Sequence, residues 1–443
     1  MGDLLALRGK LHVDTDHPKA AETTLEGFLT QLFDFTKIPE NEISILQNLA
    51  ILPSVDIPQE DLEDFLQITG NERVAFINHI HELAERGCLI RTESKEGKPV
   101  FRCHQIVQVF VRRHKKYKPT VEVCKRCIET FIWKLKIEPE DNSLQKAVWV
   151  PYGVEILEGL EGEDAGLATL ANNLAVVYQN LGDLPKALEY SKKALVIYEK
   201  ILASDHPLLA NSYANIALIY QDLGDLSKAL EYSRKALGIY ESVLASDHPY
   251  LATSYSNIAT IYQDLGDLPK ALAYSRKALV IRESVLASGH PDLASAYYNL
   301  AWIYQEMGDL PKALGDSMKA LGIYQAVFAS DHPSLANSYN NIGLIYQEMG
   351  DLPKALEYEQ KALAIYEKVL VKDHPGLANS YNNNAVIHFD IGEFDVAKKY
   401  IEKAIDIWGQ IFPNGHPILE KARKWRELIE KRLLEKKRRL VVN

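Results

Sequence analysis

Cysteine is scarce in this sequence: four occur among 443 residues, all between Cys88 and Cys127. So few thiols exclude the disulfide framework of a small secreted protein. No apolar run approaches the ~18 residues that a membrane-spanning helix needs, and the N-terminal residues lack the charged-then-apolar order of a signal peptide. Lys and Arg total 50 against 60 Asp and Glu. The resulting net charge of −10 argues against a protein that binds nucleic acids or membrane surfaces in general. We expect a cytoplasmic protein.

Catalytic and metal-binding motifs are also missing. The sequence contains no G-x-x-x-x-G-K-[ST] phosphate loop and no G-x-S-x-G nucleophile turn. His79 and His81 lack a second histidine four residues further on, as a zinc protease helix requires. The lone Cys-x-x-Cys of Cys124 and Cys127 lacks the second close pair that structural zinc sites usually bring. We predict no enzyme activity, no cofactor and no metal.

An internal repeat dominates the rest of the chain. A His-Pro pair recurs every 42 residues, at His206, His248, His290, His332, His374 and His416. A Gly-Asp pair follows the same period at Gly182, Gly224, Gly266, Gly308 and Gly350, and Gly392-Glu393 ends the series. Two dipeptides on one period indicate a repeat architecture.

Each repeat reads as two helices. In the fifth repeat, residues 335–350 have helical apolar spacing and end at Gly350, and Pro353 suits the first turn of a second helix that runs to Leu370. Helix pairs joined by short turns stack into an α-solenoid. We place the histidines as caps in the turns, because packed helices ~8–10 Å apart keep equivalent residues too distant to share a metal ion.

The repeat resembles the tetratricopeptide (TPR) family. Residues of the fifth repeat follow the order of the TPR signature: Tyr339, Ile342, Gly343, Tyr346, Gly350, Ala355 and Ala362. The 42-residue length is similar to that of kinesin light chains and many bacterial signalling proteins. The resemblance covers six repeats and implies a superhelix with a concave groove. Serine stands where a large aromatic residue is expected, at Ser191, Ser233, Ser275 and Ser317, which predicts looser packing between repeats.

Because an α-helix turns by about 100° per residue, the first helix of each repeat has an apolar stripe that faces the core and a polar stripe on the opposite side. The resemblance places this stripe in the groove, where regularly spaced amides suit a peptide backbone and an acidic row favours a basic ligand. Tyr298 and Trp302, one turn apart, offer an aromatic anchor. The candidate partner-binding residues are Asn211, Gln221, Asp222, Gln263, Asp264, Tyr298, Trp302, Gln305, Glu306, Asn337, Asn340, Gln347, Glu348 and Asn379. The alternative, that the amide and acidic rows are a solvated face, stays open. A further row of asparagines flanks the core, and we interpret it as structural: Asn173, Asn215, Asn257, Asn299, Asn341 and Asn383.

Residues 22–118 have a different pattern. Helices are expected at 24–35, 40–52, 58–68 and 71–86, followed by strands at 88–92 and 99–102 and a helix at 103–114. Helices followed by a small hairpin are the order of a winged-helix domain. The candidate recognition helix mixes Arg73 and Arg86 with three glutamates, a poor partner for phosphate, whereas Arg91, Lys95, Lys98 and Arg102 of the hairpin are better suited.

This segment also resembles the winged-helix domain of STAND-class signalling ATPases, which include NB-ARC immune regulators. The sequence FRCHQIVQVFVRR is similar to their Met-His-Asp element, with Cys103 and Gln105 in place of Met and Asp. In that family the histidine, here His104, approaches the β-phosphate of bound ADP, so His104 would sense a nucleotide if an ATPase domain is present. Residues 2–7 and 149–152 resemble flanking parts of the family. With no phosphate loop, we expect the carboxy-terminal part of such a protein, or a variant that has lost its ATPase.

The sequence therefore predicts a mainly α protein, an α-solenoid of six TPR helix pairs preceded by a winged helix. The expected parts are a remnant of a preceding helical domain (1–21), the winged helix (22–118), a helical linker (119–163), the TPR superhelix (164–415) and a basic capping helix (416–443). We expect a non-enzymatic sensor module that binds a protein or peptide, of basic character, and relays this to an ATPase module in the same or another chain. The alternatives are a free-standing adaptor like a kinesin light chain and, with less support, a DNA-binding regulator with a TPR sensor.

Overall fold

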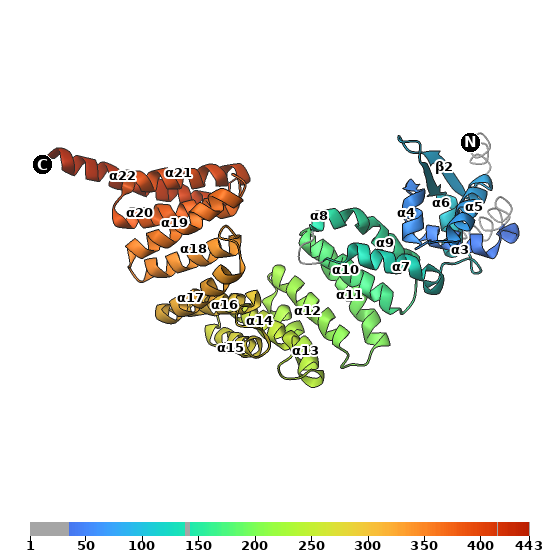
Figure 1. Cartoon of the computed structure of the whole chain (residues 1–443), viewed down its shortest axis with the longest axis horizontal. Coiled ribbons are helices and arrows are strands. Elements are labelled where there is room, and N and C mark those ends of the chain that lie inside the picture. Colours follow the sequence, from blue (N-terminus) through green and yellow to red (C-terminus); the bar gives the residue numbers. More distant parts are fainter. Residues whose placement is uncertain (1–34, 138–141, 414, 443) are drawn as a thin grey trace, which may run out of the picture. The chain divides into compact units, whose positions relative to one another are not determined.

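The computed structural model describes residues 35–137, 142–413 and 415–442. The expected remnant at 1–21, and all but the last residue of the helix expected at 24–35, lie outside these ranges. The chain divides into two compact units, residues 1–232 and 233–443. Both consist mainly of helices (Figure 1). Within the described ranges, no helix combines the length and the apolar character that crossing a membrane requires.

The N-terminal region pairs short helices with a small sheet. Its elements are the 3-10 turn η1 (Phe35–Lys37), α3 (Glu40–Ala50), β1 (Ile57–Pro58), α4 (Gln59–Phe65), α5 (Glu72–Glu85), β2 (Leu89–Glu93), β3 (Pro99–Cys103) and α6 (Gln105–Arg113). The sheet is antiparallel with strand order β1-β3-β2, and its register pairs Leu89 with Cys103 and Ile57 with Phe101. The hairpin turns at Gly97, whose φ is +75°. This order of elements is the one expected for a winged helix. Cys103 ends β3, whereas the sequence placed it at the start of the following helix.

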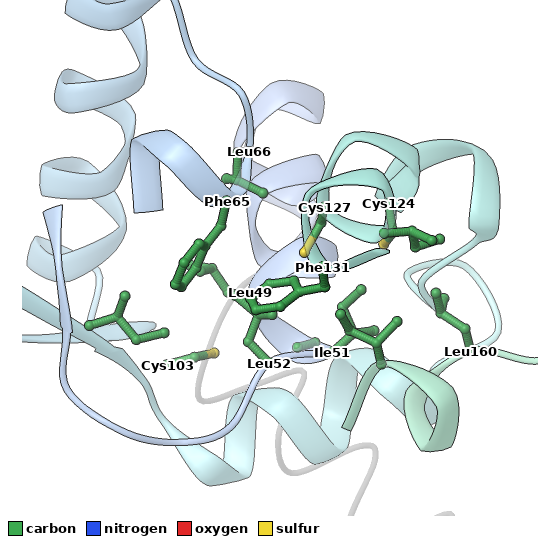
Figure 2. Close-up of a cluster of buried hydrophobic side chains, with 14 of the residues drawn as sticks. Leu49, Ile51, Leu52, Phe65, Leu66, Cys103, Cys124, Cys127, Phe131 and Leu160 are labelled. Carbon is green, nitrogen blue, oxygen red and sulfur yellow. The ribbon is translucent and has the colours of Figure 1, made fainter. Parts of the chain in front are cut away.

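An apolar cluster joins this region to the first repeat. Figure 2 shows Leu49, Leu52, Phe65, Cys127 and Phe131 gathered in one such core. The expected linker contributes α7 (Val121–Leu135), α8 (Ser143–Lys146), the 3-10 turn η2 (Ala147–Trp149) and α9 (Val150–Gly159). The same cluster continues into the first repeat through Leu167, Leu170 and Leu174. Of the linker helices, α7 and α9 therefore belong to a continuous core.

Six helix pairs follow with the expected period. They are α10 (Ala165–Asn180) with α11 (Leu184–Ile201), α12 (Pro207–Asp222) with α13 (Leu226–Val243), α14 (Pro249–Asp264) with α15 (Leu268–Val285), α16 (Pro291–Glu306) with α17 (Leu310–Val327), α18 (Pro333–Glu348) with α19 (Leu352–Val369), and α20 (Pro375–Ile391) with α21 (Phe394–Ile411). A last helix, α22 (Pro417–Val442), packs against α21. Its Trp425 meets the Phe389 ring edge-on with centroids 5.4 Å apart.

Helix caps repeat with the same period. The histidine of each His-Pro pair stands before a first helix, and its Nδ1 accepts a hydrogen bond from the backbone N–H two residues later, at 3.0–3.2 Å. The interpretation of the histidines as caps is thus confirmed. Gly350, with φ +82°, ends α18, and the Asp351 side chain then caps α19. These caps satisfy backbone groups that helix ends leave without a partner.

The four serines lie inside the stack of repeats, and the prediction of looser packing does not hold at Ser317. The serines are almost completely buried; Ser191 is 0% exposed and Ser317 is 1% exposed. The amide of Asn341 donates a hydrogen bond to Oγ of Ser317 in the preceding repeat, at 3.1 Å. At Ser317 the small side chain lets the next repeat approach closely, and Asn341 supplies the polar partner that the buried hydroxyl needs. Ser191 is buried without a hydrogen-bond partner among the described residues, and Ser275 lines a pocket.

Candidate functional site

The polar stripes of the first helices form a surface that we call the A-face. It consists of the sixth, ninth, thirteenth, sixteenth and seventeenth residues of each repeat, counted from the His-Pro histidine. In the fourth repeat these are Ser295, Tyr298, Trp302, Gln305 and Glu306. The candidate residues named from the sequence lie at these positions because the helices have the expected phase.

The amide and acidic rows of the A-face are bonded to each other. Four glutamines donate from Nε2 to the carboxylate one repeat later, in the pairs Gln179–Asp222 (2.6 Å), Gln263–Glu306 (2.8 Å), Gln305–Glu348 (2.6 Å) and Gln347–Asp390 (2.9 Å). We call these glutamine–carboxylate hydrogen bonds rungs. Sequence reasoning placed the two rows side by side but did not predict the rungs. The bonds are exposed, so each stabilises the array only slightly and a ligand can compete for either partner.

A second row links the two helices of one repeat. Ser295 lies 3.0 Å from the hydroxyl of Tyr324, Thr169 lies 2.9 Å from that of Tyr198, and the hydroxyl of Tyr366 donates to Asn337. Asn379 has no such hydroxyl beside it, because the sixth repeat carries Trp408 at the tyrosine position. This row therefore has a packing role in three repeats.

The asparagine row that we interpreted as structural makes contacts with neighbouring elements. Asn173 donates to the backbone oxygen of Ile132 at 2.8 Å. Asn383 donates to Oδ1 of Asn340 at 2.9 Å, which joins one candidate groove residue to the next repeat. Asn299 differs, since it is exposed and lines a pocket.

That pocket is the most distinctive feature of the A-face. It lies between the third and fourth repeats, encloses about 390 Å³, and is lined by Ser256, Thr260, Gln263, Asp264, Ser275, Arg282, Ala296, Asn299, Trp302, Ile303 and Glu306. The Trp302 side chain is 50% exposed at its wall. Tyr298 is partly buried, packs against the core of the following repeats, and has a raised pKa because of this burial. Trp302 is thus an available aromatic anchor, while Tyr298 is largely a packing residue.

Sequence reasoning missed Arg282. Four other repeats carry tyrosine at this position, Tyr198, Tyr240, Tyr324 and Tyr366, and the sixth carries Trp408. The signal that could have revealed Arg282 is this break in an otherwise aromatic row, one repeat before Trp302.

His104 lies at the junction of β3 and α6. It caps α6, with Nδ1 accepting from the backbone N–H of Ile106 at 3.2 Å. Its helix is tied to the core by Gln108, whose amide donates to the backbone oxygens of Leu49 and Leu52. One ring nitrogen of His104 is therefore used locally.

The N-terminal region also gathers groups of the kinds that bind metals. Glu42, His79 and Glu82 bring one ligand-type atom each within 4.8 Å of one another. Arg86 lies 3.5 Å from the Glu42 carboxylate, and burial followed by the Glu82 carboxyl raises the pKa of Glu42. The neighbouring guanidinium and the burial that raises the pKa of the Glu42 carboxyl both work against a bound cation, so we assign no metal here.

Burial also affects the Cys-x-x-Cys pair. It raises the pKa of Cys124 to about 12, and Cys127 is shifted in the same direction. Zinc binds the thiolate, so this environment works against a metal role for either sulfur.

Comparison with protein families identifies the repeats. The model of the tetratricopeptide repeat matches residues 166–242, 250–326, 305–368 and 335–410, which together make up more than half of the chain. The chain belongs to the tetratricopeptide repeat family. Repeats of this family generally form scaffolds for protein interaction and carry no catalysis of their own. The comparison with curated proteins gives no significant match.

Two solved structures show the range of similar folds. The TPR-like repeats of a putative kinesin light chain from Podospora anserina are 26% identical over 46% of this chain and 98% of their own, with a TM-score of 0.42. A STAND protein with a tetratricopeptide repeat sensor from Pyrococcus horikoshii is 17% identical over 91% of this chain and 62% of its own, with a TM-score of 0.51. The second likeness concerns the fold alone.

Proposed function

We propose that this chain is a non-enzymatic recognition module that binds a protein or peptide on its A-face. The observation that supports this most is the pocket beside Trp302, because an exposed tryptophan next to a hollow of this size is where binding energy concentrates. The acidic row of the A-face adds a preference for basic groups in the partner.

We further propose that the N-terminal region relays the bound state to an ATPase module of the STAND class. This relay is supported by direct contacts between α6, α3 and α9. Arg112 of α6 donates to the backbone oxygen of Ala50 at the end of α3 and to the Glu155 carboxylate of α9 at 2.6 Å. A Cβ on Gly159 of α9 would lie 3.0 Å from the Ile51 side chain. Close contact from α6 through α9 to the first repeat allows little independent movement, so a shift of the repeat would reach the helix that His104 caps.

The fold likeness to the Pyrococcus protein, itself described as a STAND protein with a TPR sensor, is consistent with this relay. A free-standing adaptor would use the same A-face without the relay. The DNA-binding alternative is weakened by the hairpin, where Lys98 lies 3.3 Å from Glu60 and Arg102 lies 3.5 Å from Asp56. Acidic neighbours reduce the positive field that a phosphate backbone needs.

Partner capture with two tryptophan variants tests the binding proposal. Trp302→Ala is expected to lower recovery of A-face partners from a lysate by about tenfold, the size of effect seen when an interface anchor is removed. Trp133→Ala is the matched control, because Trp133 is 72% exposed on α7, away from the A-face. Equal recovery by both variants, at matched thermal stability, would contradict the proposal.

A further inference from the structure

The third repeat departs from the others at the floor of the pocket. Arg282 replaces the tyrosine of the regular repeats, and Thr260 stands where the first, second, fifth and sixth repeats carry valine or leucine. The Thr260 hydroxyl donates to the backbone oxygen of Ser256. Asn299 and Ser275 line the pocket without the bond that joins Asn341 to Ser317 one repeat later. These residues line the hollow between the third and fourth repeats.

Arg282 brings a positive charge into this hollow. No hydrogen bond or ion pair joins its guanidinium to any group in the described part of the chain. Partial burial lowers the pKa of Arg282, and only the more distant charge of Asp292 works in the other direction. A guanidinium has five N–H donors, and leaving them partly desolvated without acceptors costs free energy. Because the guanidinium is half-buried and has no acceptor in the described part of the chain, its N–H donors are available to a bound group.

The other residues that line the pocket restrict the chemical type of the group that can bind to Arg282. Trp302 offers an apolar wall for a short aliphatic stem. Asp264 and Glu306 stand at the rim, and Glu306 already accepts a hydrogen bond from Gln263 at 2.8 Å. A free small anion would meet these two acids on its way in, whereas a carboxylate on a polypeptide can place a backbone N–H or a basic neighbour against them. A planar carboxylate also matches the fork of an arginine.

We propose that this pocket receives an acidic side chain, glutamate or aspartate, of the bound polypeptide, with the carboxylate on Arg282 and the aliphatic stem against Trp302. This rests on the proposed function and adds the chemistry of the anchor. The partner would then be mixed in charge, with an acidic anchor residue and amide or basic groups beside it for the acidic rim.

Three short peptides test the anchor chemistry directly. Ac-Gly-Leu-Glu-Leu-Gly-NH2 and its glutamine and lysine counterparts are titrated into the full chain labelled with 15N-tryptophan, and the indole resonance of Trp302 is followed. Trp302→Phe assigns that resonance. The glutamate peptide is expected to bind at least about tenfold more tightly than the glutamine peptide, because it gains a charge-assisted contact. Equal affinities, stronger binding of the lysine peptide, or no shift with any peptide would overturn the proposal.

Two variants show whether Arg282 causes the difference. Arg282→Tyr installs the residue of the regular repeats and should abolish the preference for glutamate. Lys277→Ala removes one positive charge from an exposed position on the same helix, α15, outside the pocket, and should keep the preference. A preference that survives Arg282→Tyr would overturn the assignment.

The two proposals fail in different ways. If Trp302→Ala lowers partner recovery but the glutamate peptide is not preferred, the A-face binds partners and the anchor chemistry is wrong. If the glutamate peptide is preferred but Trp302→Ala leaves partner recovery unchanged, the pocket chemistry is right and the proposed function is wrong.

Discussion

Two repeats of the array replace a neutral residue by a charged one, with opposite consequences. Arg282 of the third repeat faces a pocket and keeps its charge exposed to a ligand. Glu359 of the fifth repeat stands where the first four repeats carry serine, and it is fully buried. Burial raises the pKa of Glu359 to about 8, so the carboxyl is mostly protonated at neutral pH. The carboxyl inside the stack is neutralised by a proton, whereas the guanidinium at the pocket stays charged and available for recognition.

The fifth repeat also shows how the larger side chain is accommodated. The first four repeats pair alanine with serine across the two helices, as in Ala301 and Ser317, and the fifth pairs Gly343 with Glu359. A Cβ on Gly343 would lie 2.8 Å from Cγ of Glu359. Asn383 of the next repeat donates to one carboxyl oxygen at 3.5 Å, and the other oxygen is buried without a hydrogen-bond partner among the described residues. The third repeat has no matching compensation around Arg282.

The largest predicted effect is a pH dependence of stability caused by Glu359. Its folded pKa lies above the unfolded value of about 4.5, so its contribution is complete below about pH 4.5 and is lost as the pH rises to about 8. The slope is at most about 1.4 kcal/mol per pH unit, which gives a loss of a few kcal/mol in the free energy of unfolding. Denaturant unfolding at pH 5 and pH 8.5 measures it.

Glu359→Gln serves as the control for this prediction, since it keeps the shape and cannot ionise. It should flatten the stability profile between pH 5 and 8.5 without affecting peptide binding at the Arg282 pocket. An unchanged slope in Glu359→Gln would show that other groups cause the pH dependence.

The next effect concerns the glycine. Gly343→Ala alone should destabilise the chain by about 1–3 kcal/mol through overpacking against Glu359. Combined with Glu359→Ser, which restores the pair of the first four repeats, the same substitution should cost nothing. A double-mutant cycle of unfolding free energies checks the coupling, and additive effects would contradict the account of the Gly343–Glu359 pair.

Arg282→Tyr is expected to move stability the other way. The new hydroxyl would reach Thr253 as Tyr198 reaches Thr169, and the unpaired guanidinium would be gone. We expect a gain of about 1 kcal/mol at neutral pH, together with the loss of the glutamate preference. A clear loss of stability would mean that Arg282 supports the fold rather than a ligand.

The smallest effect is expected for the exposed rungs. Gln263→Ala removes one hydrogen bond to Glu306 and should change the free energy of unfolding by less than about 0.5 kcal/mol. Thermal unfolding beside the wild-type chain measures this. A loss several times larger would give the rungs a structural role that their exposure does not suggest.

The sequence predicted the repeating part well because local signals agree with tertiary packing. The 42-residue period, Gly350 as a helix end and the histidine caps are all local, and α18 and α19 begin and end within two residues of the expected positions. The strands of the hairpin were also placed to within one residue. β1 was missed, because two residues carry no alternation pattern.

The candidate site was less predictable, because it depends on distances between repeats. A helical wheel places Gln263 and Glu306 on the same surface, but only the offset between stacked repeats brings them into contact. Tyr298 has the phase of an exposed residue, yet the neighbouring repeat covers much of it. Features that the repeats share do not reveal Arg282, because it stands where the third repeat lacks the aromatic residue of the others.

The rungs between Gln263 and Glu306, Gln305 and Glu348, and Gln347 and Asp390 give the A-face an exchange property. A basic group that takes over one of these carboxylates releases a glutamine amide at the same place, and that amide can then meet a carbonyl oxygen of the incoming chain. Neither the carboxylate nor the amide loses its hydrogen-bond partner in this exchange, so the A-face can accept many backbones at little cost. The choice between them then depends on the few positions where the repeats differ.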